Sequence, residues 1–418
     1  MFSRRDFLKI GGLSLTTFGL GSGLVSCAPH DTESKLTDMT AGVEPLTMRD
    51  FEKRQEKAGR LMAEHNLDGL LLTGSTDLRY FTSVEWGRSE RTFGAVLNRK
   101  REPVWVCPAF EEERARERIP EGQEIRTWHE HEDPFRLIAE IMRDLGAAHG
   151  RLATGPTVRN FVLYGLKQRA PGLELLNGAV ITESCRACKT EKELGYMDLA
   201  AKITKMAYRD TFDRLSRGMS TGDVRLLIQQ AHERMGAMGR GGPSFGPNSA
   251  FPHGSKVVRD LQDGDIVLVD GGCSIEGFRS DVSRTVVFGQ PSDRQRQVWD
   301  VVRKAQVAAH EAIRPGVCCE DIDWAARKVI EDAGFGPDYA FFSHRLGHGI
   351  GMDGHESPYL VRGNKLKLEP GMTFSNEPGI YIYGEFGVRV EDCFVVTEDG
   401  AYILGGMEST AIDQPFGT

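Results

Sequence analysis

The chain has 418 residues, which is enough for two domains that each bury a hydrophobic core of their own. Hydrophobic residues make up 40% of the sequence and charged residues 27%, which are the proportions of an ordinary globular protein. The net charge of −8 and the lack of a basic stripe argue against a nucleic-acid-binding surface.

The N-terminus has the features of an export signal. Residues 1–9 carry Arg4, Arg5 and Lys9, and residues 10–25 form a short apolar stretch that glycines interrupt. This stretch is too short for a comfortable membrane span and is built like the apolar part of a signal peptide. The basic run resembles the twin-arginine export motif. The alternative is a fortuitous basic N-terminus.

A cysteine at the end of the apolar stretch indicates a lipid anchor. Residues 24–27, which end in Cys27, resemble a bacterial lipobox, where the signal is removed before a cysteine that then carries lipid. We expect residues 1–26 to be the signal and the protein to be periplasmic or otherwise extracytoplasmic, anchored to the membrane as a lipoprotein. The alternative is cleavage nearby, with Cys27 removed or left as a free thiol. Because the signal is basic, the mature chain is more acidic, and only lipid would hold it at an anionic membrane.

The first half of the mature chain is predicted to be an α/β domain, residues 48–182, preceded by a polar tether, residues 27–47. A helix begins at Met48, and the apolar run from Gly69 to Leu72 follows as a buried strand. The later elements predicted from apolar spacing are a hairpin of residues 93–97 and 103–107, helices at 133–146 and 157–170, and strands at 151–154 and 173–176.

The second half, residues 183–418, is predicted to mix helices with β-hairpins. A long helix is expected from Glu191 to Ser216. A second is expected from Thr221 to Met238, with Ser220, Thr221 or Asp223 as its cap. Two more helices are expected at 291–313 and 320–333. The order lacks clean βαβ units and a GxGxxG or P-loop motif, so a nucleotide-binding domain is a poor interpretation.

The eight cysteines are expected to be mostly free thiols. The twin-arginine route carries proteins that have already folded in the reducing cytoplasm, where disulfides do not persist. The CxxC formed by Cys185 and Cys188 has no second half, so a structural zinc site is not expected.

Five residues of the second half suggest a metal centre. Asp270 is expected to end a hydrophobic strand, and turn-forming residues between it and Asp281 suit a hairpin that joins both carboxylates. Further on come His348, Glu377 and Glu391. Four carboxylates and one imidazole suit two divalent ions held close together, because bridging carboxylates offset the repulsion between the ions.

The order and the flanking sequences of these residues resemble the pita-bread metallopeptidases, which include methionine aminopeptidase, prolidase, aminopeptidase P and creatinase. The segments that carry the resemblance are residues 249–254, 348–356 and 376–379. The resemblance implies an α+β chain in which a creatinase-type α/β N-terminal domain, residues 48–182, precedes a pita-bread catalytic domain, residues 183–418.

The resemblance also implies a role for each of the five ligands. Asp270 would bind one metal ion, His348 and Glu377 would bind the other, and Asp281 and Glu391 would bridge both. The ions would activate a water for attack on the scissile carbonyl. Manganese is the expected metal, with cobalt, zinc and iron as alternatives.

Further roles are implied for residues around the metals. Glu377 would carry a proton from the attacking water to the leaving amine, and His253 and His355 would hold the substrate and stabilise the oxyanion. The alternatives are a loop histidine for His253 and a capping histidine for His355. Arg389 would orient a ligand carboxylate, unless it is an exposed strand arginine. His344 is interpreted as structural.

The implied function is that of an exopeptidase that cuts short peptides, with proline after the scissile bond. The pattern of residues 347–351 resembles prolidase and its dipeptidase relatives more than aminopeptidase P. The alternative is a non-peptidase on the same scaffold, such as a small-amide hydrolase or a lyase. The complete ligand set argues against a catalytically silent binding protein. The expected partners are a short peptide substrate and, in a homodimer, a second copy of the chain; nucleic acid is not expected.

Two features of the N-terminal domain bear on the same function. Trp86 is hypothesised to reach an active site, in its own subunit or in that of a dimer partner, with packing inside its own domain as the alternative. His129 and His131 flank Glu130 and would share a face if they lay on a strand. Nothing nearby completes a metal site, so we interpret them as solvated or dimer-contact residues.

Overall fold

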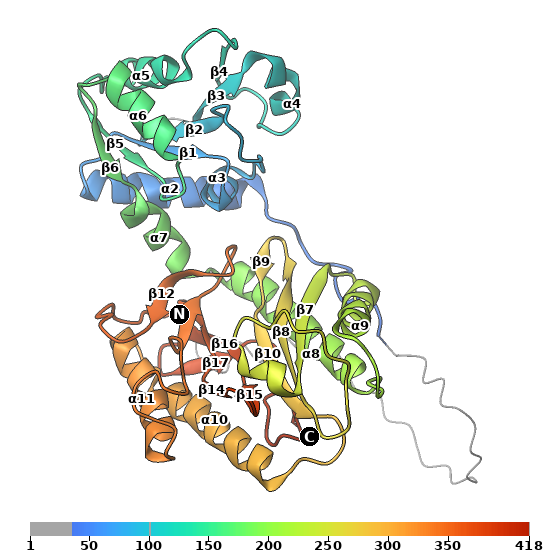
Figure 1. The fold of residues 1–418 in the computed structure, drawn as a ribbon. Coiled ribbons are helices and arrows are strands. Elements are labelled where there is room, and N and C mark those ends of the chain that lie inside the picture. The colour runs from blue at the N-terminus through green and yellow to red at the C-terminus, as the bar shows by residue number, and fades with distance from the viewer. Residues whose placement is uncertain (1–35, 100–101, 418) are drawn as a thin grey trace. The chain divides into compact units, whose positions relative to one another are not determined.

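The computed structural model describes residues 36–99 and 102–417, which form two compact units. The smaller unit is Glu44–Arg186, and the larger contains residues 187–417 together with residues 36–43 (Figure 1). The expected signal and Cys27 lie outside the described residues. None of the helices in the described ranges has both the length and the apolar character needed to cross a membrane.

The described part of the expected tether is irregular but makes contacts. Residues 36–47 contain no helix or strand. The amide of Met39 donates a hydrogen bond to the carbonyl of Met235 at 3.1 Å, and the hydroxyl of Thr40 lies 3.5 Å from the carbonyl of Gly236. The first part of this segment is therefore attached to the larger unit.

A six-stranded mixed sheet forms the centre of the smaller unit. Its strands are β1 (Gly69–Thr73), β2 (Gly94–Leu97), β3 (Val104–Pro108), β4 (Ile125–Trp128), β5 (Arg151–Thr154) and β6 (Glu174–Asn177). Their order is β4-β3-β2-β1-β5-β6, with β1 antiparallel to β2 and parallel to β5. The core under this sheet includes Leu71, Val96, Ile138 and Met142, all fully buried.

Helices cover both faces of this sheet. They are α2 (Met48–Glu64), α3 (Thr76–Thr82), α4 (Glu112–Arg116), α5 (Pro134–Asp144), α6 (Asn160–Arg169) and α7 (Ala179–Ala187). Figure 1 shows α2 and α3 on one side of the sheet and α5 and α6 on the other. The predicted helices and strands of this unit are all present, whereas α3, α4, β4 and α7 were not predicted. The predicted domain end at 182 falls inside α7, and the division between the units follows Arg186.

Trp86 and the pair His129 and His131 all lie in the smaller unit. The Trp86 ring stacks on Phe93 with centroids 3.8 Å apart, and the Arg114 guanidinium lies 4.5 Å from the Trp86 ring centroid. These contacts within one unit support the packing alternative for Trp86. His129 and His131 are exposed and lie in and beside the turn after β4, so they do not lie on a strand. Their rings stack at 5.9 Å.

The first half of the larger unit is a sheet backed by two helices. Its elements are α8 (Glu191–Phe212), α9 (Thr221–Arg234), β7 (Gly239–Phe245), the 3-10 helix η2 (Gly246–Ala250), β8 (Ile266–Ile275), β9 (Phe278–Arg279) and β10 (Val282–Val287). The strand order is β10-β8-β7, and β9 pairs with β8. The core between this sheet and α8 and α9 includes Tyr208, Ile228, Val267 and Val269.

The second half repeats this plan with a larger sheet. Its elements are α10 (Asp293–Ala312), α11 (Cys319–Asp332), β11 (Gly347–Gly349), β12 (Glu356–Leu360), β13 (Thr373–Asn376), β14 (Gly379–Ile382), β15 (Phe386–Arg389), β16 (Asp392–Val396) and β17 (Ala401–Ile403). The five-stranded sheet has the order β12-β11-β13-β16-β17, and β14 pairs with β15. Helices α10 and α11 pack against this half around Trp299, Ile322 and Phe374.

Hydrogen-bonded caps begin the long helices of the larger unit. Thr190, Ser220 and Ser292 each accept a bond from the backbone of the third helical residue, whose own side chain bonds back to the cap. Ser220 is thus the cap of α9 among the predicted candidates. Seven cysteines lie in the part of the chain that the structure describes, and all are free thiols.

Candidate metal centre

Asp270 lies in the middle of β8. The prediction that the strand ends at this residue is wrong, because β8 continues to Ile275. Asp270 pairs with Gly242 of β7 on one side and with Ser283 of β10 on the other. Its carboxylate is therefore held between two neighbouring strands, and its side chain is still 40% exposed.

Two glycines after Asp270 allow the strands to meet this closely. A Cβ on Gly271 would lie 2.3 Å from the carbonyl oxygen of Arg240, and one on Gly272 would lie 2.0 Å from that of Ser280. Any side chain at either position would push the paired backbones apart. The glycines thus permit the hairpin that places Asp281, just before β10, on the same side as Asp270.

The other three ligand candidates come from the second half of the unit. His348 lies in β11, Glu377 directly follows β13, and Glu391 directly precedes β16. The amide of Glu391 donates to the carbonyl of Ser283 at 3.1 Å, in an isolated antiparallel bridge that joins the two halves. This bridge brings Glu391 beside Asp270 and Asp281.

The structure brings all five candidates together in overlapping groups. Asp270, Asp281 and Glu391 have ligand atoms that all lie within 4.8 Å of one another, and so do His348, Glu377 and Glu391. Nε2 of His348 lies 3.2 Å from Oε1 of Glu377 and 3.8 Å from Oδ2 of Asp281. Glu391 belongs to both groups, and Asp281, a member of the first group, lies near His348 of the second. The bridging roles expected of Asp281 and Glu391 fit these positions and stay predictions.

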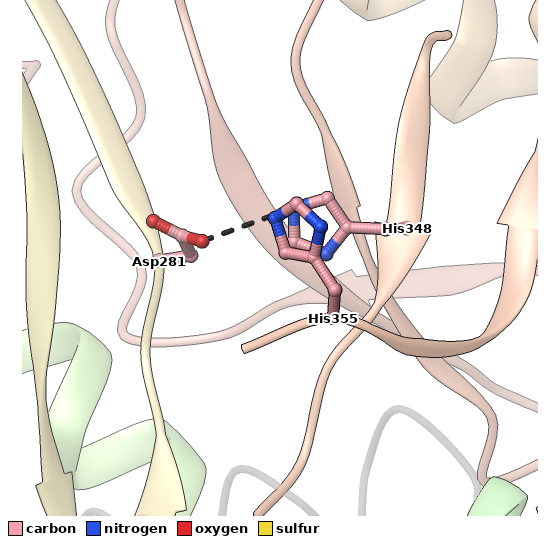
Figure 2. A group of neighbouring side chains, drawn as sticks. All are labelled: Asp281, His348 and His355. Carbon is pink, nitrogen blue, oxygen red and sulfur yellow. Dashed lines mark ion pairs between the residues drawn. The ribbon is translucent and has the colours of Figure 1, made fainter. Parts of the chain in front are cut away.

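A third group includes a histidine to which no metal was assigned. Asp281, His348 and His355 also have ligand atoms within 4.8 Å of one another. Figure 2 shows the Asp281 carboxylate facing the two histidine rings, which stack with centroids 3.7 Å apart. Nδ1 of His355 lies 3.1 Å from Nη2 of Arg345. His355 therefore lies at the centre, and its expected role toward a substrate stays a prediction.

Ser283, which was not predicted as a site residue, connects the carboxylates. Its hydroxyl oxygen lies 2.9 Å from Oδ1 of Asp270 and 2.6 Å from Oε2 of Glu391, and it accepts a hydrogen bond from Nε of Arg389 at 2.9 Å. Nothing next to Ser283 in the sequence marks this role, so only the strand pairing with Asp270 and Glu391 reveals the contact.

Arg389 is almost completely buried, at 3% exposure, so it is not an exposed strand arginine. Its Nη2 lies 2.9 Å from Oδ2 of Asp270. Its Nη1 donates to the hydroxyl of Tyr381 at 3.0 Å and to the carbonyl of Pro252 at 3.2 Å. The same tyrosine hydroxyl lies 2.8 Å from Nε2 of His344. Arg389 thus orients Asp270 while Tyr381 and Pro252 hold its guanidinium.

The carboxylates form an excess of negative charge. Burial and then Asp270 raise the pKa of Asp281 to about 8. Burial and then Asp281 raise the pKa of Glu391 well above its usual value. Burial alone would also raise the pKa of Glu377, but the hydrogen bond with His348 and the charges of His344, His348 and Arg389 together lower that pKa to about 2. Arg389 alone does not balance these charges.

The donor set fits two divalent cations. Carboxylate oxygens and one imidazole are ligands that manganese, iron, cobalt and zinc accept. Two ions would supply the positive charge that the raised pKa values of Asp281 and Glu391 indicate is lacking. Backbone pairing fixes the ligand-bearing strands, so the site is largely formed by the fold itself.

The centre lines a cavity of about 460 Å³. Besides the five candidate ligands, its walls contain Pro252, His253, Tyr339, Ser343, His344, Arg345, His355, Val361 and Arg389. His344, interpreted as structural, faces this cavity, and burial lowers its pKa. His253 and His355 share the cavity with the ligands, as expected of residues that contact a substrate.

A second buried charge cluster lies beside Glu391 and was not predicted. The carboxylate of Asp392 accepts hydrogen bonds from Lys205 at 2.7 Å and from Arg284 at 2.8 Å. All three side chains are completely buried. Nη1 of Arg284 also donates to the carbonyl of Glu391 at 2.7 Å. The cluster therefore holds the backbone of a candidate bridging ligand in place.

Comparisons with known proteins agree with this geometry. Residues 195–398 match metallopeptidase family M24, and residues 54–188 match the creatinase/prolidase N-terminal domain. An Xaa-Pro dipeptidase of Lactobacillus helveticus is 35% identical over 355 residues, covering 82% of this chain and 94% of its own length. A probable dipeptidase PepE of Mycobacterium tuberculosis is 35% identical over 359 residues, covering 84% of this chain and 93% of its own length.

Solved structures show the same fold. The dipeptidase PepE from Mycobacterium ulcerans superposes with a TM-score of 0.80 at 34% identity, covering 86% of this chain and 97% of its own. A prolidase from Thermococcus sibiricus superposes with a TM-score of 0.77 at 29% identity, covering 85% of this chain and 96% of its own. The chain therefore belongs to metallopeptidase family M24, with a creatinase-type N-terminal domain before the catalytic domain.

Proposed function

We propose that this protein is a two-metal dipeptidase that hydrolyses the bond between any residue and a following proline. The observation that carries the proposal is the convergence of four carboxylates and His348 from separate strands on one cavity, with Glu391 shared between two ligand groups. Two divalent ions bound there would supply a nucleophilic water near neutral pH and polarise the scissile carbonyl.

The residues around the ligands have the chemistry that peptide hydrolysis requires. Glu377 is kept ionised by its hydrogen bond with His348, so one of its oxygens can take a proton from the attacking water and pass it to the leaving amine. His355 is positioned to donate a hydrogen bond to the oxygen on which negative charge develops. Arg345 and His355 form a wall that would attract the carboxylate end of a short peptide.

The preference for proline is supported by the relatives and by the shape of the site. The similar proteins from Lactobacillus helveticus and Thermococcus sibiricus are called an Xaa-Pro dipeptidase and a prolidase. Tyr339 and Val361 line the same cavity as Arg345, and their side chains would pack against an apolar ring. The cavity of about 460 Å³ suits a small ligand.

A panel of Xaa-Pro and non-proline dipeptides, assayed with and without a chelator, tests the proposal. We expect Xaa-Pro dipeptides to be cleaved, the chelator to abolish turnover and added divalent metal to restore it. Longer peptides should be cleaved slowly or not at all. Turnover of small amides without any dipeptide cleavage would contradict the proposal and favour the alternative hydrolase on the same scaffold.

Metal identity and oligomeric state are finer parts of the same proposal. Manganese is the metal we infer, because an oxygen-rich ligand set accepts it and a protein folded before export could acquire it in the cytoplasm. We also infer a homodimer. Reconstitution of the chelated protein with manganese, iron, cobalt or zinc would rank the metals, and light scattering during size-exclusion chromatography would give the oligomeric state.

We further infer export by the twin-arginine route and lipidation at Cys27. Replacement of both Arg4 and Arg5 by Lys should leave the precursor in the cytoplasm, because the arginine pair and not the charge is the proposed address. Cys27→Ala should be exported but move from the membrane fraction to the soluble fraction. Retention of Cys27→Ala in the membrane would contradict the lipid anchor.

A further inference from the structure

A second cavity of about 420 Å³ adjoins the metal centre. It shares Pro252, His253, Asp270 and Arg389 with the first cavity. The rest of its wall comes from the start of α9, from β7, from η2, from Leu268 of β8 and from the loop of residues 251–258. The mechanism described above uses none of these further residues.

A glycine keeps this cavity open. In β7, Gly241 faces the core, because a Cβ there would lie 2.9 Å from Ile228 and 3.0 Å from Val269. Gly242 is exposed and lines the cavity, and a Cβ there would meet nothing closer than the carbonyl oxygen of Asp270 at 3.6 Å. Larger side chains at Gly242 would therefore extend into the cavity without straining the strand.

Two cations at the wall have no partner among the residues that the structure describes. Arg225 of α9 and Lys256 of the 251–258 loop are exposed, and neither forms a hydrogen bond or ion pair within residues 36–99 and 102–417. The one carboxylate in this wall is Asp270, and it is already paired with Arg389. The cavity therefore presents positive charge that nothing in the described protein neutralises.

The loop that carries Lys256 is tied to its surroundings. Nδ2 of Asn248 donates to the carbonyl of Val257 at 2.8 Å, and the Phe251 ring packs on Tyr383 with centroids 5.2 Å apart. The side chains of Phe251 and Val257 are exposed hydrophobic groups. A ligand with an aliphatic stem and an anionic end would thus find both apolar contact and positive charge here.

The charges of the centre set the direction in which a dipeptide lies. Asp270 is the most exposed of the four carboxylates, with 40% of its side chain exposed against 24% for Asp281. Arg345 and His355 lie in the wall of the first cavity. The carboxylate end of the substrate is attracted toward Arg345, so the amino end lies at the opposite side of the first cavity, where Asp270 and Arg389 are shared with the second cavity. The side chain next to the amino group then points into the second cavity.

We propose that this second cavity binds the side chain of the N-terminal substrate residue and selects acidic side chains through Arg225 and Lys256. The inference rests on the proposed Xaa-Pro dipeptidase function and names its preferred substrates, Glu-Pro and Asp-Pro. An ion pair with a partly exposed cation favours the charged side chain by about fivefold at low salt.

Glu-Pro and Gln-Pro provide the test, because they have the same shape and differ in charge. The wild-type protein, fully loaded with metal, should have a kcat/KM about fivefold higher for Glu-Pro at low salt, and salt should weaken this preference. The double variant Arg225→Gln and Lys256→Gln should bring the ratio close to one. Lys304→Gln on α10, which lines neither cavity, is the matched control and should keep the wild-type ratio.

Gly242→Val tests the placement of the side chain independently of charge. It should lower kcat/KM for Glu-Pro and Leu-Pro more than for Gly-Pro, since only the longer side chains enter the cavity. Cleavage of Gln-Pro and Glu-Pro at equal rates by the wild type would overturn the acidic preference while Xaa-Pro hydrolysis stands. Equal loss on both substrates in the double variant would also overturn it, since the cations would then bind the peptide carboxylate. Failure to cleave any dipeptide would overturn both proposals.

Discussion

Glu391 and Asp392 are neighbours in the sequence, both are buried, and their surroundings have opposite charge balance. The carboxylate of Asp392 faces two cations, Lys205 and Arg284. Burial would raise the pKa of Asp392, but these cations lower it. Glu391 instead faces Asp281, Glu377 and Asp270, and burial together with these acids raises its pKa well above the usual value.

The difference separates a structural charge cluster from a functional one. Around Asp392 the protein supplies its own counter-charges, so the cluster is complete and stabilises the fold. Around Glu391 it supplies mainly Arg389, so the cluster needs charge from outside the chain. Two buried histidines repeat the contrast. Glu377 raises the pKa of His348 despite its burial, whereas burial lowers the pKa of His232, which has no acidic partner among the described residues.

Removal of a shared ligand should have the largest effect on activity. Asp281→Ala or Glu391→Ala leaves two cations poorly compensated, so at least one metal ion should be lost and kcat/KM should fall by about a thousandfold, or about 4 kcal/mol of barrier. Metal analysis and dipeptide assays of the purified variants check this. Two bound metal equivalents with wild-type turnover would contradict the bridging role of that residue.

Substitution of Asp392, the neighbour of Glu391, should lower stability. Asp392→Asn leaves Lys205 and Arg284 buried without a counter-charge, so the free energy of unfolding should fall by about 3–5 kcal/mol. Denaturant unfolding of chelated protein measures this, with the exposed Asp300→Asn as control. Glu391→Gln in the same assay should be at least as stable as the wild type, because it removes surplus negative charge. If both variants lose equal stability, the distinction between the clusters is wrong.

The two sides of this comparison were not equally visible in the sequence. The candidate ligands of the centre were predicted, because their order and flanking sequences resemble a known family, and His348 and Glu377 lie within two of the matching segments. Lys205 and Arg284 were not, because their partner Asp392 is distant in the chain and nothing local marks a buried lysine or arginine. Gly242 and Arg225 were also not predicted. They line a cavity that forms only when separate elements pack together, so no local pattern marks them.

Element boundaries show a similar limit. The helix expected to reach Ser216 ends at Phe212, because the backbone of Gly218 and Met219 pairs with Leu261, which lies far along the chain. Asp270 was expected at a strand end because glycines follow it. Those glycines instead let three strands approach closely, which only the pairing partners reveal.

A smaller effect on stability is expected from His232, the buried histidine without an acidic partner among the described residues. The folded-state pKa of His232 lies below its unfolded value of 6.5, because burial disfavours the imidazolium. Its contribution to stability is therefore present above pH 6.5 and is lost as the pH falls through the folded-state pKa, by up to about 1.4 kcal/mol per pH unit. Between about pH 7.5 and pH 5, at constant ionic strength, the free energy of unfolding of His232→Gln should depend less on pH than that of the wild type. Identical profiles would show that His232 does not contribute.

The most direct test of the two-metal centre is a count of bound metal against activity. Chelated protein should be titrated with manganese while bound metal per chain and Xaa-Pro dipeptide turnover are measured in the same samples. The charge imbalance around Glu391 predicts two bound equivalents per chain, with full turnover reached only at the second. Saturation of binding and of turnover at a single equivalent, or turnover in the chelated protein, would contradict the two-metal centre.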